Sequence, residues 1–197
     1  VVALASVISA KLLTSWLPGA SASSAAPPPI GTVAAAVALT LLMGLLVGLL
    51  HALLINQLRL PPFIATLATL AGLRSLAAVI SQQRPIVVPF DSFRKLGSDP
   101  WITVPLFAAV ALVISVMMGK TVLGRHLYAL GGNETAARLS GLSIPRLKLI
   151  AYGLSGLLAA MAGILFTGKT GQGQSTLGVS YELYAITAAV VGGCSLG

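Results

Sequence analysis

A long stretch without charge constrains this chain more than any other feature. Between Ile30 and Ile55 there is no Asp, Glu, Lys or Arg, and most residues are apolar. A helix needs about 20 such residues to cross the hydrocarbon core of a bilayer. Of the 197 residues, 56% are hydrophobic and 8% charged, whereas soluble domains carry about 25% charged residues. The sequence therefore predicts an all-α, polytopic bundle of transmembrane helices. It excludes a soluble enzyme, a disordered tail and a disulfide-rich secreted scaffold.

Other apolar stretches predict further membrane segments. We expect complete spans at residues 30–55, 63–81, 101–118 and 150–167, and incomplete ones at residues 1–17 and from Leu183. Polar, proline-rich or glycine-rich connections lie between them, at residues 20–29, 56–62, 82–100, 119–148 and 168–180. The chain opens on Val1 inside an apolar run, and the segment after Glu182 is too short to cross a bilayer, so we expect residues 1–197 to be a fragment of one transmembrane domain. This fragment has five to six membrane segments.

Small residues at helical spacing indicate close packing between spans. Gly44 and Gly48 stand four residues apart in the first complete span, and Ser155, Ala159 and Gly163 form a similar series in the last. Small side chains let the backbones of two helices approach closely within a membrane. These two series predict helix contacts.

The distribution of basic residues predicts the orientation. Placing residues 56–62 and 119–148 on one side of the membrane collects a basic set there: Arg59, Lys120, Arg125, Arg138, Arg146 and Lys148. The other side holds fewer: Arg84, Arg94, Lys95, Lys169 and, near the first segment, Lys11. Cytoplasmic loops carry the excess of Lys and Arg, so the first set is predicted to be cytoplasmic. The basic residues are scattered singly along the chain, which does not favour nucleic-acid binding.

Two short motifs match catalytic patterns but lie in the wrong context. Gly163–Thr170 reads GILFTGKT, a Walker A pattern, but it begins inside an apolar helix and lacks the preceding strand that a phosphate loop requires. Gly193–Gly197 reads GCSLG, a nucleophile-elbow pattern, but it also lacks a strand. With two histidines and one cysteine, Cys194, the chain offers no metal-ligand cluster. We expect no catalytic residue, no metal site and no cofactor.

Two ionisable residues stand at or near membrane depth. Arg74 lies inside an apolar segment, and Glu182 lies at the start of the last one. Such residues are functional candidates because burying a charge in a membrane is costly. The alternatives are a structural pairing with helix-end carbonyl groups for Arg74 and a place at the interface for Glu182.

The polar stretch at residues 119–148 predicts a short helix between two spans. Gly131 and Gly132 end the preceding helix, Asn133 caps a new one, and Gly141 ends it. Pro145 then fits the first turn of the next span. By its residues alone, this short helix is either a surface that docks into a partner or an interfacial linker.

Three stretches give the chain a resemblance to a known family. PFIATLATLAGLRSLA, GRHLYALGGNETAARLSGL and YELYAITAAVVGGCSLG follow one another in order and cover most of the chain. They resemble the membrane permeases of ABC sugar importers, the branch typified by the ribose permease. The chain departs from that family at Tyr184, where an acidic residue is common, and at Cys194, where Thr is common.

The resemblance implies a transport function without enzymatic activity. The chain would belong to a monosaccharide importer in the bacterial cytoplasmic membrane, with the translocation pathway formed by two permease copies. ATP would be used by a cytoplasmic ABC ATPase, and the sugar would arrive from a periplasmic or lipid-anchored binding protein. The residues implied in coupling to the ATPase are Asn133, Glu134, Ala137, Arg138, Leu139, Ser140 and Gly141.

Two other functions follow from different residue patterns. A secondary transporter or channel for a small polar solute would carry broken helices and several buried charges, and the sequence offers Arg74. An intramembrane enzyme would need paired carboxylates or a metal cluster within its spans, which the sequence does not offer.

Overall fold

The computed structural model describes residues 1–15, 30–58 and 60–193. Along these residues the order of elements is α1 (Val2–Ser15), α2 (Ile30–Gln57), α3 (Pro62–Ile80), β1 (Ile86–Val87), α4 (Asp91–Ser98), α5 (Pro100–Lys120), α6 (Val122–Gly132), α7 (Glu134–Leu139), α8 (Ile144–Thr170), β2 (Gln172–Gly173) and α9 (Tyr181–Val191). The expectations placed on residues 20–29, Arg59, Cys194 and the end of the GCSLG pattern lie outside the described residues.

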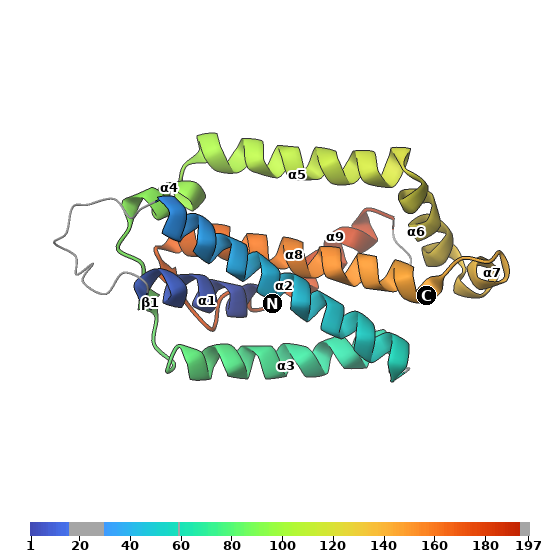
Figure 1. Ribbon diagram of the computed structural model, residues 1–197, viewed down its shortest axis with the longest axis horizontal. Helices are drawn as coiled ribbons and strands as arrows, with labels where there is room; N and C mark the ends of the chain where they lie inside the picture. Colours follow the sequence, from blue (N-terminus) through green and yellow to red (C-terminus); the bar gives the residue numbers. More distant parts are fainter. Residues whose placement is uncertain (16–29, 59, 194–197) are drawn as a thin grey trace.

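Four helices of the described part have the length and apolar composition of a membrane span. They are α2, α3, α5 and α8, and the apolar helices α1 and α9 are shorter. The four complete spans predicted from the sequence are therefore confirmed, as is the all-α polytopic class. Figure 1 shows α5 and α3 along opposite sides, with α2 and α8 crossing between them.

The crossing of α2 and α8 depends on glycine. A Cβ atom added at Gly44 would lie 2.7 Å from the carbonyl oxygen of Gly156, and one added at Gly156 would lie 2.9 Å from the Cα of Gly48. Both separations are shorter than van der Waals contact allows, so the two backbones approach as closely as glycine permits. The predicted role of Gly44 and Gly48 in helix packing is confirmed.

The small residues of α8 face two different neighbours. Gly156 and Ala160 meet α2, whereas a Cβ atom at Gly163 would lie 2.7 Å from the carbonyl oxygen of Val2 in α1. Ser155 and Ala159, which the sequence grouped with Gly163, instead line a cavity. Of the three small residues that the sequence placed in one series, Gly163 therefore contacts a helix, whereas Ser155 and Ala159 line a cavity.

A buried hydroxyl cluster strengthens the contact between α1 and α8. Thr167 Oγ1 lies 2.8 Å from Ser6 Oγ, and the backbone amide of Gln174 donates to the same Ser6 oxygen at 3.3 Å. Ser6 and Thr167 are fully buried. Hydrogen bonds between helices satisfy polar groups that lipid cannot satisfy.

The loop expected at residues 82–100 is partly ordered secondary structure. Ile86 and Val87 pair antiparallel with Gly173 and Gln172, and α4 packs on α8 through Phe93, which is 1% exposed. A Cβ atom at Gly168 would lie 3.0 Å from the amide nitrogen of Gly97 in α4. This close contact between distant segments, which no local sequence pattern encodes, orders the helix.

The connections gather at two ends of the bundle. Pairing of β1 with β2 brings residues 82–100 and 168–180 together at one end. At the other, Asn56 Nδ2 donates to the carbonyl oxygen of Pro145 at 3.0 Å and so joins the end of α2 to the start of α8. Figure 1 shows β1 and α4 at one end and α6 and α7 at the other. This arrangement agrees with the two sets of loops used to predict orientation.

Candidate functional site

The polar stretch after α5 folds into two capped helices. Thr121 accepts a hydrogen bond from the Gly124 amide at 3.2 Å and begins α6, which ends at Gly132. Asn133 Oδ1 then accepts from the Ala136 amide at 2.9 Å and begins α7. A side chain that accepts from the first free amides of a helix stabilises it by about 1 kcal/mol. The predicted break, cap and short helix are confirmed as local structure.

The end of α7 depends on a left-handed glycine. Gly141 has φ +80°, and the Leu142 amide donates to the carbonyl oxygen of Ala137 at 3.1 Å. This is the hydrogen bond typical of a helix that ends on glycine. Ser143 precedes α8, and Pro145 lies in its first turn, where the missing amide hydrogen costs least. The connection from α7 to the span is therefore short and defined by backbone geometry.

The residues of α7 and its end differ in exposure. Leu139 is 85% exposed and Ala137 4% exposed, while Arg138 and Ser140 are exposed. Ala137 therefore packs inward and shapes the helix, whereas Leu139 projects from it. Leu139 is the last residue of α7, and its side chain is one of the most exposed large apolar side chains among the described residues.

Glu134 joins α7 to the span that follows. Its carboxylate lies 2.9 Å from Lys148 Nζ, and Arg138 reaches the same carboxylate at 3.5 Å. Only the Arg138 pairing follows from the spacing of four residues along one helix. Lys148 is fourteen residues away in the sequence, so sequence reasoning missed it. Two features of the sequence could have indicated this pair: the opposite charges of Glu134 and Lys148, and the short connection between α7 and α8.

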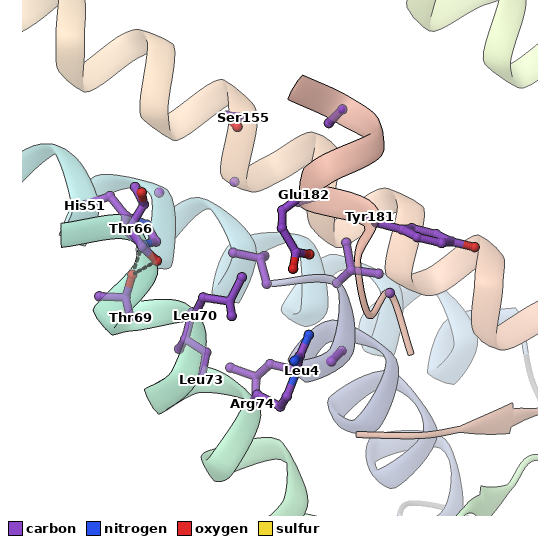
Figure 2. A pocket seen from close by; sticks show the side chains of 18 of the residues that line it. Leu4, His51, Thr66, Thr69, Leu70, Leu73, Arg74, Ser155, Tyr181 and Glu182 are labelled. Atoms are coloured by element: carbon purple, nitrogen blue, oxygen red, sulfur yellow. Dashed lines mark hydrogen bonds between the residues drawn. The ribbon is translucent and has the colours of Figure 1, made fainter. Parts of the chain in front are cut away.

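A cavity of about 530 Å³ opens between α1, α2, α3, α8 and α9. Both ionisable candidates line it, Arg74 from α3 and Glu182 from α9. Figure 2 shows the two side chains on different walls, both directed into the space between the helices. The sequence singled out each residue separately, and the fold brings them to one cavity.

The cavity lies at membrane depth. Ser155, Gly156 and Ala159 line it and belong to the middle of α8. Glu182 lies in the first turn of α9 and reaches the same cavity. Among the described residues neither Arg74 nor Glu182 forms an ion pair. Burying such charges in lipid alone would be costly, so a hydrated cavity suits them.

Neutral polar groups occupy the wall formed by α2 and α3. His51 Nε2 forms a hydrogen bond with Thr69 Oγ1, drawn as a dashed line in Figure 2. Thr69 and Thr66 also bond to backbone carbonyl groups of α3, and these bonds orient their hydroxyl groups. The cavity thus combines a donor, an acceptor and several hydroxyl groups with apolar side chains such as Leu70 and Leu73.

The Walker A pattern has a different structure from a phosphate loop. Gly163–Thr170 lies entirely within α8, where the backbone amides bond along the helix and cannot cradle a phosphate. Within the described part of the chain no group of three His, Cys, Asp or Glu side chains is placed to hold a metal ion.

Apolar spans, close glycine crossings and a cavity between helices that holds a few polar side chains define a polytopic integral membrane protein. Residues 1–197 match the family model described as the permease component of branched-chain amino acid transport systems, and the chain belongs to this family. It is a family of transport subunits and not of enzymes. The resemblance stated from the sequence motifs is confirmed.

Curated relatives are permease proteins of import systems, among them systems for ribose and L-arabinose. The ribose import permease protein of Haemophilus influenzae is 38% identical over 79% of this chain and 51% of its own length. The L-arabinose transport system permease protein of Escherichia coli is 40% identical over 72% of this chain and 44% of its own length. The autoinducer 2 import system permease protein of Photorhabdus luminescens is 32% identical over 80% and 49%. The chain spans about half the length of these relatives. No solved structure matches it.

Proposed function

We propose that this chain is part of the permease subunit of an ABC importer for a monosaccharide such as ribose. Relatives that are 38–40% identical are ribose and L-arabinose permeases, and this naming supports a sugar as the solute. In the described residues the Walker A pattern lies inside a helix and has no phosphate-binding context. In this proposal the energy comes from a partner, a cytoplasmic ABC ATPase, which binds the ATP.

The observation that carries ATPase coupling is the construction of α7. It is capped at both ends, tied to α8 by the Glu134–Lys148 ion pair, and presents Leu139 outward. A short rigid helix between the spans α5 and α8 transmits a displacement of a docked partner to these spans. We assign Asn133 and Gly141 to shaping this helix, and Leu139, Arg138 and Ser140 to the docking surface.

The assembly follows from this assignment. The protein works in the bacterial cytoplasmic membrane with α7 on the cytoplasmic side. A second permease copy completes the pathway, and a periplasmic or lipid-anchored sugar-binding protein delivers the solute to the end that holds β1 and β2. Movement at α7 passes to α8 through Lys148 and to α2 through the hydrogen bond between Asn56 and Pro145.

The test uses the full-length protein with its ATPase and binding protein in liposomes. Gly141→Pro removes the left-handed turn and is expected to abolish ATP-driven uptake of D-ribose and L-arabinose while insertion persists. Gly141→Asn is the matched control, because asparagine tolerates φ near +80°. It is expected to retain uptake. Unchanged uptake in Gly141→Pro would refute docking at α7.

A secondary transporter is the second candidate, because Arg74 and Glu182 share an intramembrane cavity. Charged residues in such cavities mark the pathways of ion-coupled carriers. The same liposomes decide between the two functions. Sugar uptake that needs no ATPase and follows an imposed proton or sodium gradient would support the secondary transporter.

A further inference from the structure

We propose that the cavity between α1, α2, α3, α8 and α9 is a binding subsite for the sugar in transit, with Arg74 and Glu182 as its polar contacts. The class of ligand rests on the proposed function. The position of the subsite and its two charged contacts rest on the geometry of the cavity.

The size of the cavity suits a small ligand. Its volume of about 530 Å³ falls within the range of about 300–1,000 Å³ that small-molecule pockets occupy. It is lined from five helices, three of which are complete spans: α2, α3 and α8. Two of these spans, α2 and α8, also form the closely packed crossing of the bundle.

The two charges have complementary hydrogen-bonding chemistry. An arginine side chain only donates, and an ionised glutamate only accepts. A sugar hydroxyl group both donates and accepts. A polyhydroxylated molecule between Arg74 and Glu182 can therefore accept hydrogen bonds from the guanidinium and donate hydrogen bonds to the carboxylate at the same time. A simple cation or anion would satisfy one wall and be repelled by the other, which favours a neutral polar solute.

Arg74 and Glu182 face the cavity separately and do not pair with each other. Neither Arg74 nor Glu182 forms an ion pair or side-chain hydrogen bond among the described residues, and both are half-buried. A structural pair would bring the two groups into contact with each other. Groups that face a cavity separately remain available to water or to a solute that replaces water.

The remaining lining supports brief binding. Thr66, Thr69 and His51 supply neutral polar atoms whose positions are set by hydrogen bonds. Leu70, Leu73 and Ala159 supply apolar surface without hydrogen-bonding capacity. Few polar contacts on an apolar wall give orientation without tight binding, as a transport pathway requires.

The test measures occupancy of the cavity directly. Ser155→Cys places a thiol on the cavity wall of the full-length protein, in a background without other cysteines. The probe is the small hydrophilic reagent 2-sulfonatoethyl methanethiosulfonate, with and without D-ribose or L-arabinose. A sugar present at ten times its dissociation constant is expected to slow labelling about tenfold. Thr170→Cys, exposed at the end of α8 and outside the cavity lining, is the control and is expected to be labelled at an unchanged rate.

Variants then assign the contacts. Arg74→Gln and Glu182→Gln are expected to raise the sugar concentration needed for protection at least about tenfold, the effect of losing a hydrogen bond to a charged group. Arg125→Gln, on α6 and away from the cavity, is expected to leave it unchanged. Arg74→Lys keeps the charge and is expected to restore part of the protection, which a failure to fold would not allow.

Each outcome bears on a separate claim. Protection by sugar without ATP-driven uptake supports the subsite and refutes the coupled importer. ATP-driven uptake of a sugar that gives no protection at Ser155→Cys refutes the subsite and leaves the importer standing. Equal protection in Arg74→Gln, Glu182→Gln and the parent refutes the assignment of the two contacts.

Discussion

Lys148 Nζ lies 2.9 Å from Glu134 Oε2, so a residue in the first turns of α8 holds the first turn of α7. The two residues are fourteen positions apart. Lys148 is partly buried, with 21% of its side chain exposed, whereas the competing partner Arg138 is 70% exposed. The ion pair to Lys148 is therefore less screened by water than the ion pair to Arg138.

We expect Lys148→Gln to weaken coupling more than Arg138→Gln. Loss of the Lys148 pair costs about 1 kcal/mol, which lowers the ratio of correctly held to released α7 about fivefold. The measurement is sugar transported per ATP hydrolysed in liposomes. The exchanged pair Glu134→Lys with Lys148→Glu is expected to recover much of the loss. Equal effects of Lys148→Gln and Arg138→Gln would argue against this role.

The crossing of α2 and α8 predicts a glycine requirement. A Cβ atom at Gly48 would clash with the carbonyl oxygen of Tyr152, so Gly48→Ala is expected to destabilise the protein by about 1–3 kcal/mol. The matched control is Gly72→Ala in α3, because a Cβ atom at Gly72 meets no atom within 4 Å. The control is expected to gain about 0.5–1 kcal/mol from better helix propensity. Thermal unfolding in detergent compares the two variants, and a control that loses as much as Gly48→Ala would contradict this explanation.

The buried hydroxyl cluster predicts a polar contribution to stability. Thr167→Val removes the hydrogen bond to Ser6 while it preserves shape, and leaves a buried hydroxyl short of a partner. A loss of about 1–3 kcal/mol is expected. Thr170→Val, one turn further along α8 and exposed, is expected to change stability by at most about 0.5 kcal/mol. Thermal unfolding again provides the comparison, and similar melting shifts in both variants would count against the cluster.

The cap of α7 predicts a graded series at one position. Asn133→Ala loses the hydrogen bond to the Ala136 amide and is expected to destabilise α7 by about 1 kcal/mol. Asn133→Asp keeps a hydrogen-bond acceptor and is expected to leave the stability of α7 unchanged. Because α7 is the proposed docking helix, ATP-driven uptake should fall for alanine and not for aspartate. Equal uptake in both variants would show that the hydrogen bond of the Asn133 cap does not contribute to ATP-driven uptake.

The two ends of the bundle predict opposite accessibility. Arg84→Cys lies beside β1, and Arg146→Cys lies in the first turn of α8; both positions are exposed. In spheroplasts a membrane-impermeant maleimide is expected to label the first variant and to reach the second only after permeabilisation. The reverse pattern would invert the orientation and place α7 outside the cytoplasm.

Local patterns in the sequence were sufficient to predict the spans, the proline in the first turn of α8, and the break, cap and end of α7. Each depends on neighbouring residues: uninterrupted apolar side chains, a missing amide hydrogen, an acceptor next to free amides, or a glycine that adopts positive φ. The small-residue spacing of Gly44 and Gly48 likewise predicted a contact, although it did not identify α8 as the partner.

The tertiary structure decided which distant residues meet. It ordered α4 and the β1–β2 pairing inside expected loops, separated Gly163 from Ser155 and Ala159, paired Glu134 with Lys148, and brought Arg74 and Glu182 to one cavity. The cavity depends on how α3 and α9 lie beside α1 and α8, whereas the Glu134 pair and the ordering of α4 depend on contacts of α7 and α4 with α8. A single sequence encodes the periodicity of each helix, whereas the rotation and partner of each helix follow from the packing of the whole bundle.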